Sequence, residues 1–362
     1  YYCELGITNR ILTLAISNFQ DISVDVDHLI LQFEKKNNIT FAESQKDAII
    51  SAFQNGIEII TGGPGTGKTT IIKCIIEIFE TCGLKVLLGA PTGRAAKRMS
   101  ESTGKEATTI HRMLDMGVFE KEESVFVTNA EEHSLEADVV IIDEASMIDI
   151  TLMNALLKSI KVGTRLIIVG DVDQLPSVGA GNVLNDFIES GFTKVVRLKE
   201  IFRQGKESMI VVNAHKINKG EMPKLNEKGT DFFFIRNDIQ EGILNTIIDL
   251  INTRLPRFNS NWDKLKSIQV LVPMKKGVLG VTNLNERIQN VLNPKAPYKK
   301  EKEFRSMVFR EGDKVMQIKN NYSLKWTRIA GKGDHEGLGV FNGDMGFIES
   351  IDLEGKKLSI IF

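Results

Sequence analysis

The stretch Gly62-Gly63-Pro64-Gly65-Thr66-Gly67-Lys68-Thr69 decides the fold of this chain, because it matches the pattern G-x-x-x-x-G-K-[ST] in full. Residues 57–61 before it read as a short buried strand, and residues 70–79 after it have the apolar spacing of a helix. Strand, glycine-rich loop and helix therefore come in the order that a phosphate-binding loop requires. A glycine-rich turn without a function would not need this order. The stretch predicts an α/β fold of the P-loop type.

The same loop predicts a nucleotide site. Its glycines let successive backbone N–H groups turn toward one anion, Lys68 supplies a positive charge for the β and γ phosphates, and the Thr69 hydroxyl can ligate Mg²⁺. ATP and Mg²⁺ are therefore the expected cofactors. Gln45, which precedes the first strand, is a candidate for contact with the adenine edge. The expected nucleotide-binding residues are Gln45, Gly62, Gly63, Pro64, Gly65, Thr66, Gly67, Lys68, Thr69 and Thr70.

Composition places the chain among soluble globular proteins. Its 362 residues are 42% apolar and 26% charged, enough for two or three domains, and no run of 18 or more apolar residues predicts a membrane helix. Three cysteines without metal-ligand spacing fit a reducing cytosol, so we expect a cytoplasmic protein with no membrane partner. The formal net charge of -1 means that nucleic acid would have to bind in a local groove. Because the chain opens on Tyr1 rather than Met, we expect it to lack its natural N-terminus.

Short apolar runs recur along the first two hundred residues and predict a parallel sheet covered by helices. Polar residues follow each run. In an open α/β sheet, ligands bind at the carboxyl ends of the strands, so these polar groups should meet at one edge. The five runs are residues 57–61, 85–90, 139–142, 165–169 and 194–198.

The groups expected at that edge form a catalytic set. Asp143 can hold the Mg²⁺ already touched by Thr69, and Glu144 can act as general base on the attacking water. Gln174 can hydrogen-bond the γ phosphate or its water, and Arg203 can stabilise charge that develops in the transition state. Lys68 completes the expected catalytic group. The alternatives are a solvated acidic pair at a strand end and a surface arginine.

Residues 90–112 combine cations, hydroxyls and a histidine next to the predicted ATP edge. Such a set suits the phosphates of a single-stranded nucleic acid, although a solvated helix face would look similar. The cations are Arg94, Lys97, Arg98, Lys105 and Arg112.

A second α/β unit is predicted beyond about residue 205. It begins with a strand at 232–235, a helix at 238–255, a strand at 268–272 and a helix at 281–292. From about residue 294 the pattern changes to short strands and turns, which predicts a small β-barrel or insert. The strands expected there are residues 315–318, 346–351 and 358–362, with a turn at 352–355.

Together these residues resemble superfamily 1 DNA helicases of the RecD type, the family of the exodeoxyribonuclease V alpha subunit and its stand-alone relatives. The resemblance runs from about residue 39 to the end of the chain. It implies tandem RecA-like domains that clamp ATP, 5'-to-3' translocation on single-stranded DNA, and a role in recombination or repair. The stretches that carry it are residues 62–69, 90–96, 109–114, 143–147, 170–178 and 202–204.

The resemblance also implies a division of the chain and a set of DNA contacts. A duplex junction and the subunits of a nuclease complex become candidate partners. The DNA contacts implied are Pro91, Thr92, Gly93, Arg94, Thr109 and His111. The domains implied are 1–40, the helical end of a truncated N-terminal domain; 41–204, the first RecA-like domain with a hairpin insertion at about 115–137; 205–293, the first part of the second RecA-like domain; and 294–362, a truncated SH3-like insertion.

Two features depart from the family pattern. The expected strand-separating hairpin is rich in glutamate, which matches a phosphate surface poorly. The late His-Lys-x-Gln-Gly motif and a second catalytic arginine are absent from the 362 residues. We therefore expect this chain to be a fragment that binds nucleotide, hydrolyses it poorly and does not unwind DNA.

Three other interpretations stay open. The helicase half of a conjugative relaxase shares much of this motif set, and an upstream nicking domain with a catalytic tyrosine would favour it. A nucleic-acid clamp gated by ATP would turn over ATP without displacing a strand. A small-molecule P-loop kinase is the third, although no stretch here resembles an acceptor site.

Overall fold

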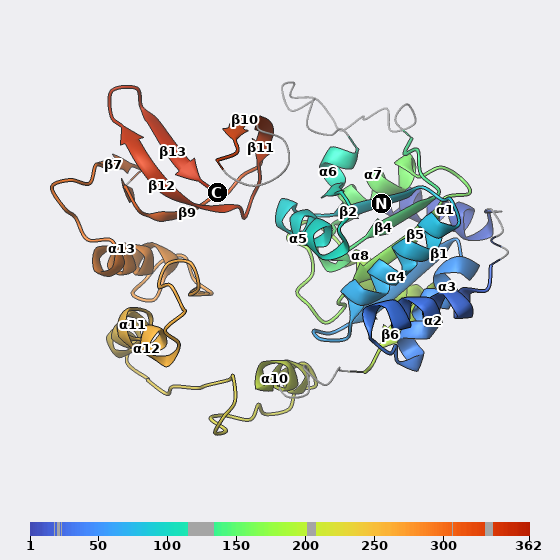
Figure 1. The fold of residues 1–362 in the computed structure, drawn as a ribbon, viewed down its shortest axis with the longest axis horizontal. Coiled ribbons are helices and arrows are strands. Elements are labelled where there is room, and N and C mark those ends of the chain that lie inside the picture. The colour runs from blue at the N-terminus through green and yellow to red at the C-terminus, as the bar shows by residue number, and fades with distance from the viewer. Residues whose placement is uncertain are drawn as a thin grey trace. The chain divides into compact units, whose positions relative to one another are not determined.

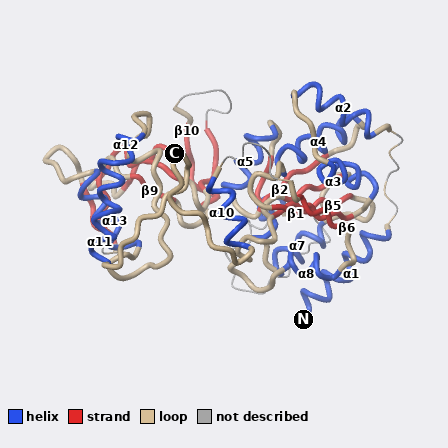
Figure 2. Tube along the Cα trace, turned by 90° about the horizontal axis from the view of Figure 1, so that it is seen from below, coloured by secondary structure: helices blue, strands red, loops and turns tan. Residues whose placement is uncertain are grey.

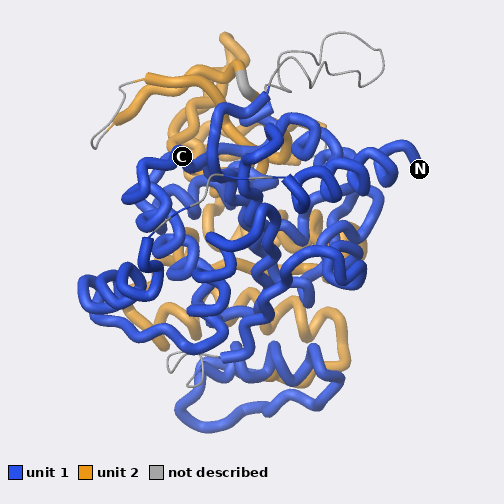
Figure 3. Tube along the Cα trace, turned by 90° about the vertical axis from the view of Figure 1, so that its right-hand side faces the viewer, with its two compact units in different colours: residues 1–233 blue, residues 234–362 orange. Residues whose placement is uncertain are grey.

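The computed structural model describes residues 1–17, 19, 22, 24–114, 134–200, 208–305, 307–329 and 336–362. The chain divides into two compact units, unit 1 from Tyr1 to Phe233 and unit 2 from Phe234 to Phe362 (Figure 3). The expected domain boundaries near residues 40, 204 and 293 remain predictions.

A sheet forms the centre of unit 1 (Figure 1). Its strands are β1 (Ile57–Gly62), β2 (Val86–Ala90), β3 (Ala107–Thr109), β4 (Val139–Ile142), β5 (Arg165–Gly170) and β6 (Lys194–Leu198). They lie in the order β3-β2-β4-β5-β1-β6, and every neighbouring pair is parallel. The five apolar runs predicted to be strands are all strands, which confirms the expected sheet. The sixth strand, β3, was not predicted because its sequence, Ala-Thr-Thr, contains no apolar run.

Helices and helical turns accompany these strands in unit 1. They are α1 (Tyr2–Ile16), α2 (Val26–Asn37), α3 (Glu43–Gln54), α4 (Lys68–Thr81), α5 (Gly93–Thr103), α6 (Ile110–Met113), the 3₁₀ turn η1 (Ala145–Met147), α7 (Ile150–Ser159), α8 (Val183–Ser190) and α10 (Met209–Asn218). Figure 2 shows α2, α3 and α4 on one side of the strands and α1, α7 and α8 on the other. None of the described helices is both long enough and apolar enough to cross a membrane.

Two hydrophobic cores fill the layers between sheet and helices. Ile60 belongs to the core under α2, α3 and α4, whereas its neighbour Ile59 belongs to the core under α1, α7 and α8. This alternation follows from the strand geometry, in which successive side chains point to opposite faces. Both faces of the strands are therefore apolar, as in a buried parallel sheet.

Within the first forty residues, Tyr2–Ile16 and Val26–Asn37 are helical, as predicted, and both helices pack into these same cores. Leu14 of α1 is fully buried in one core, and Ile30 and Phe33 of α2 are buried in the other. We therefore describe α1 and α2 with unit 1.

Unit 2 begins with helices. They are α11 (Gln240–Asp249), the π-helical turn η2 (Leu250–Arg254), α12 (Leu255–Phe258) and α13 (Val281–Leu292), which confirms the two helices predicted there. The strands predicted at 232–235 and 268–272 are wrong, because both segments lie outside the strands of the described chain. An apolar run forms a strand only if a neighbouring strand satisfies its backbone groups, and neither segment pairs with one here.

Antiparallel strands follow α13. They are β7 (Glu301–Phe304), β8 (Met307–Arg310), β9 (Lys314–Met316), β10 (Asn321–Thr327), β11 (Glu336–Val340), β12 (Met345–Asp352) and β13 (Lys357–Ile361). They pair as β7 with β8, β10 with β11, and β13-β12-β9. The three strands predicted at 315–318, 346–351 and 358–362 are present as β9, β12 and β13, with bounds shifted by one or more residues.

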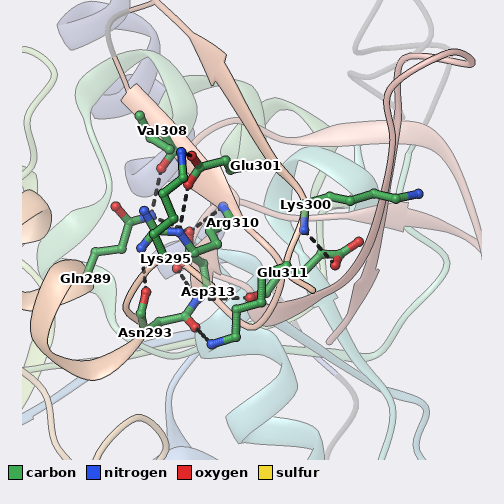
Figure 4. Close-up of polar contacts among 10 residues, drawn as sticks. Gln289, Asn293, Lys295, Lys300, Glu301, Val308, Arg310, Glu311 and Asp313 are labelled. Atoms are coloured by element: carbon green, nitrogen blue, oxygen red, sulfur yellow. Dashed lines mark hydrogen bonds and ion pairs between the residues drawn. The ribbon is translucent and has the colours of Figure 1, made fainter. Parts of the chain in front are cut away.

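A buried polar cluster joins α13 to these strands (Figure 4). Arg310, 5% exposed, donates through Nε to Glu301 at 3.0 Å and through a second nitrogen to the carbonyl of Asn293. The carboxylate of Asp313 accepts from the side-chain amides of Gln289 at 2.6 Å and Asn293 at 2.7 Å. It also accepts from the main-chain N–H of Arg310 at 2.7 Å. The charged groups are therefore buried with partners, which is the condition for burying them without a large penalty.

Candidate nucleotide site

The P-loop of residues 62–69 connects β1 to α4, in the arrangement expected from its sequence. Gly65 and Gly67 have φ of 75° and 83°, in the left-handed region that glycine enters without steric cost. Gly67 is also the N-cap of α4, so the unpaired N–H groups of the first helical turn face the loop. This arrangement can bind an anion.

The side chain of Lys68 folds back toward the start of the P-loop. Its ammonium donates to the carbonyl of Gly62 at 2.6 Å and to that of Gly63 at 3.1 Å, while the Thr66 hydroxyl donates to the same Gly63 carbonyl at 2.8 Å. The loop therefore holds its cation at its own centre, where phosphate oxygens can replace the carbonyls as partners.

Gln45 contacts the backbone on both sides of its amide. Its Nε2 donates to the carbonyl of Thr66 at 2.9 Å, and its Oε1 accepts from the N–H of Ala42 at 3.0 Å. Only 1% of the residue is exposed. These two bonds join the amide to the P-loop at Thr66 and to the start of α3 at Ala42, and the adenine contact of Gln45 stays a prediction.

Asp143 and Glu144 follow β4. In the strand order β4-β5-β1, one strand, β5, lies between β4 and the P-loop strand β1. Glu144 has φ of 55°, a conformation that costs a residue with a side chain of the order of 1–3 kcal/mol. Its N–H donates to Oδ1 of Asp143 at 2.8 Å. Backbone strain of this kind clusters at functional sites.

Burial dominates the titration of Asp143 and raises the pKa of its carboxyl. The Glu144 carboxylate adds to the rise, whereas the hydrogen bond from the Glu144 N–H opposes it. The charges of Lys68 and Arg98 also favour the ionised form and hold the pKa of Asp143 down. Asp143 follows β4 and Lys68 follows β1, so the carboxyl ends of these parallel strands bring the acidic pair and the P-loop cation to one edge of the sheet.

The end of β5 packs closely against the acidic pair. A Cβ on Gly170 would lie 2.9 Å from Cδ2 of Leu184 and 3.2 Å from the backbone nitrogen of Ala145, so a larger residue here would push against the turn after Glu144. The next turn is tied to β1, because the Thr61 hydroxyl accepts from the N–H of Val172 at 3.2 Å. Gln174 is exposed on the loop that follows. The structure thus places Gln174 after the strand between β4 and β1.

Thr69 and Asp143 fit a magnesium ion by the chemistry of their oxygen atoms. A hydroxyl and a half-buried carboxylate are hard ligands of the type that Mg²⁺ takes, with waters and phosphate oxygens completing its shell. No group of three or more His, Cys, Asp and Glu side chains suited to a metal occurs among the described residues. A self-sufficient protein cage for a metal is therefore not part of the described site.

The expected DNA contacts lie after the neighbouring strands β2 and β3, where Ala90 pairs with Thr109. The Thr92 hydroxyl caps α5 by accepting from the Ala95 N–H at 3.2 Å, and the Thr109 hydroxyl caps α6 by accepting from the Arg112 N–H at 3.1 Å. Sequence reasoning missed these capping roles. Arg94 is exposed, whereas Pro91, Gly93 and His111 are half-buried. Because β2 and β3 are parallel neighbours, all six residues lie at the same edge of the sheet.

Two expected features fall outside the described residues. Arg203, the expected transition-state cation, is one of them. The other is the hairpin insertion at about 115–137, of which the structure describes only residues 134–137. Both therefore stay predictions.

Sequence reasoning did not single out His215 of α10. Its ring lies against Gly63, so that a Cβ on that glycine would be 2.6 Å from Cε1 of the imidazole. No spacing rule connects the P-loop with a histidine so far along the chain.

Two family models match separate parts of the chain. One, an AAA domain, covers residues 45–180, which include the P-loop and the acidic pair. The other, the SH3 domain of ATP-dependent RecD-like DNA helicases, covers residues 284–362, which include α13 and the antiparallel strands. The chain belongs to the RecD-like helicase family. The predicted P-loop fold and the SH3-like β region are thereby confirmed.

Relatives of this RecD-like chain are longer than the chain. It is 33% identical to the ATP-dependent RecD2 DNA helicase of Deinococcus radiodurans over 328 residues, which are 91% of the chain and 41% of that helicase. It is 37% identical over 187 residues to the RecBCD enzyme subunit RecD of Mycolicibacterium smegmatis, with 45% of the chain and 33% of the subunit covered. The chain thus spans about two fifths of the first relative and one third of the second.

Among solved structures, the chain resembles one described as DNA unwinding at forked duplex DNA by two coordinating Pif1 helicases. The match has a TM-score of 0.44 and 16% sequence identity, and it covers 89% of this chain and 76% of the other. The family assignment rests on the sequence matches.

Proposed function

We propose that this RecD-like chain supplies the nucleotide-binding and SH3-like parts of an ATP-dependent DNA helicase. The observation that carries the proposal is the arrangement of the P-loop after β1 and of Asp143 and Glu144 after β4, at the carboxyl ends of strands in one parallel sheet. This is the arrangement that phosphoryl transfer to water needs, because catalysis there consists mainly of positioning and charge stabilisation. The finer proposal is 5'-to-3' translocation in DNA recombination or repair, in the cytoplasm.

Each residue at the site has a proposed role in ATP hydrolysis. Lys68 binds the β and γ phosphate oxygens, and Glu144 takes the proton of the attacking water. Gln174 orients that water or contacts the γ phosphate, and Arg203 stabilises the charge of the transferring group. Thr69 and Asp143 would hold Mg²⁺, which neutralises phosphate charge when bound.

The proposed DNA track runs over the carboxyl ends of β2 and β3. Arg94 is exposed there beside residues whose hydroxyls fix the starts of α5 and α6, so its charge projects from a rigid edge. Single-stranded DNA and a duplex junction are the proposed substrates, and subunits of a nuclease complex are candidate partners. Because the chain's net charge is -1, such binding would depend on this local group.

The test is the steady-state ATPase rate of the full-length protein, of which we propose this chain to be a part, with and without single-stranded DNA at two salt concentrations. We expect DNA to stimulate the rate and added salt to reduce the stimulation, because salt competes for phosphate contacts. Strand displacement from duplexes with a single-stranded 5' or 3' end then assigns the polarity. ATP turnover that ignores DNA would contradict the helicase proposal, and DNA-stimulated turnover without strand displacement would favour a clamp.

A further inference from the structure

Helix α10 is held firmly near the end of unit 1. The carboxylate of Asp231 accepts from the N–H groups of Met209 and Ile210 at 2.6 and 3.2 Å, and from the hydroxyl of Ser208 at 2.5 Å. In the middle of the helix, the fully buried Asn213 bonds to the N–H and the carbonyl of Lys224, both at 2.8 Å. The side chains of α10 are therefore carried by a fixed backbone.

His215 on this helix touches the P-loop at Gly63. A Cβ on Gly63 would lie 2.6 Å from Cε1 of the imidazole, 3.3 Å from Nε2 and 3.5 Å from Nδ1. Gly63 is not among the glycines with positive φ, so its backbone alone does not require glycine. The ring fills the space that a Cβ would take, so a side chain on residue 63 would force the imidazole to shift.

The contact lies at a residue of the loop that also contacts Lys68. The carbonyl of Gly63 accepts from the ammonium of Lys68 at 3.1 Å, so the imidazole and the phosphate-binding cation share one residue of the loop. Nε2 of His215 is buried and has no hydrogen-bond partner among the residues that the structure describes. A buried ring nitrogen of this kind is costly unless a partner arrives, and a bound phosphate would bring oxygen acceptors to this place.

We propose that His215 contacts the nucleotide, with Nε2–H donating a hydrogen bond to an oxygen of the terminal phosphate of ATP. The proposal rests on the proposed binding of ATP at the P-loop. It requires only the neutral tautomer with the proton on Nε2, since either ring nitrogen of a histidine can carry it. Because the γ phosphate is missing from ADP, His215 would distinguish the triphosphate from the diphosphate.

The experiment measures the affinity of the purified chain for fluorescent ADP and for a fluorescent, non-hydrolysable ATP analogue, both with Mg²⁺. In His215→Ala we expect roughly tenfold weaker binding of the ATP analogue, the loss of one hydrogen bond to a charged group, and little change for ADP. His215→Gln should recover part of the affinity, because the glutamine amide can place a donor near Nε2. His28→Ala, at an exposed histidine of α2, is the matched control and should match the unchanged chain.

The outcomes separate this inference from the proposed function. A chain that binds neither nucleotide would contradict the P-loop proposal itself. A chain that binds both, and whose His215→Ala variant binds the ATP analogue as before, would overturn the role of His215 alone. Equal weakening for ATP and ADP would also overturn it, because it would mean that the ring merely supports the loop. Gly63→Ala should weaken binding of the ATP analogue less in the His215→Ala variant than in the unchanged chain. If the two changes instead weaken binding by additive amounts of free energy, the contact between His215 and Gly63 would be contradicted.

Discussion

The main-chain N–H of Glu144 donates a 2.8 Å hydrogen bond to Oδ1 of Asp143, and Glu144 itself has φ of 55°. The backbone of Glu144 is thus bonded to Asp143, the proposed metal ligand, while the Glu144 carboxylate is left for its proposed role as general base. The close approach of Gly170 to Ala145 confines the turn from the other side. The position of the Glu144 carboxylate is therefore set by the backbone, and an isosteric change should alter its chemistry without moving it.

Glu144→Gln should bind ATP as the unchanged chain does and lose turnover. The amide cannot accept the proton of the attacking water, and general-base catalysis is worth about 10²- to 10⁴-fold in rate. Equilibrium binding of a fluorescent ATP analogue and the steady-state ATPase rate check the two halves of this prediction. Glu189→Gln, at an exposed glutamate of α8, is the control. A Glu144→Gln variant with normal turnover would show that another group is the base.

Lys68→Ala should abolish nucleotide binding. The ammonium is held over the loop by two carbonyl oxygens and would exchange them for charged phosphate oxygens, each such bond being worth about 1.5–3 kcal/mol. We therefore expect affinity for ATP to fall by roughly 100-fold or more in isothermal titration. Lys73→Ala changes an exposed lysine of the same helix and should leave binding intact. A fall shared by both variants would mean that the net charge of α4, rather than Lys68, governs affinity.

Arg94→Ala should weaken binding of single-stranded DNA and make it less dependent on salt. A lysine or arginine that neutralises one phosphate of a single strand contributes about 0.7 to the slope of log affinity against log salt. Fluorescence anisotropy with labelled oligonucleotides at several salt concentrations measures that slope. Lys158→Ala is the control. It removes one positive charge from an exposed lysine near the end of α7, before β5 begins at the opposite edge of the sheet, and it should leave the salt slope unchanged. Equal slopes for Arg94→Ala and the unchanged chain would remove Arg94 from the DNA track.

The parallel sheet and the P-loop could be predicted because their signals are local. The four residues of β4 and the six of β5 are buried along their whole length, so each reads as an apolar run bounded by polar residues. The P-loop spacing lies within eight residues. Tertiary contacts left no such signal. The support of Thr66 by Gln45 joins residues 21 positions apart, and the contact of His215 with Gly63 appears only after α10 has packed.

The predicted strands at 232–235 and 268–272 failed for a related reason. An apolar run shows that side chains favour burial, but a strand also needs a neighbour for its backbone N–H and C=O groups. Neither segment has such a neighbour among the residues described in unit 2. The left-handed conformation of Glu144 was equally invisible, since it depends on Asp143 and on the turn against Gly170 rather than on residue type.

Arg310→Met should destabilise unit 2 by about 2–3 kcal/mol, the usual cost of removing hydrogen bonds to a charged group. The change leaves Glu301 and the Asn293 carbonyl without their buried partner. Urea unfolding followed by tryptophan fluorescence is a selective measurement, because both tryptophans of the chain, Trp262 and Trp326, lie in unit 2. Arg287→Met, at an exposed arginine of α13, is the control, and equal midpoints for the two variants would mean that the buried cluster adds no stability.

Glu58 of β1 is a buried carboxyl with an incomplete set of partners. Its Oε1 accepts from the Ser51 hydroxyl, whereas Oε2 is buried with no partner in the described part of the chain. Burial raises the pKa of Glu58 to about 8, although Ser51 and the charge of Lys194 oppose the rise. Folding therefore favours the protonated form of this side chain.

Unit 1 should consequently lose stability as the pH rises from about 4.5 to about 8. Between these values the folded state binds a proton that the unfolded state releases, so the free energy of unfolding falls by up to about 1.4 kcal/mol per pH unit. Glu58→Gln does not titrate and should abolish this decline, whereas Glu101→Gln, at an exposed glutamate, should keep it. Circular dichroism melts at several pH values measure the difference, and tryptophan fluorescence identifies any contribution from unit 2. Parallel declines in Glu58→Gln and the unchanged chain would mean that Glu58 is ionised in the folded protein.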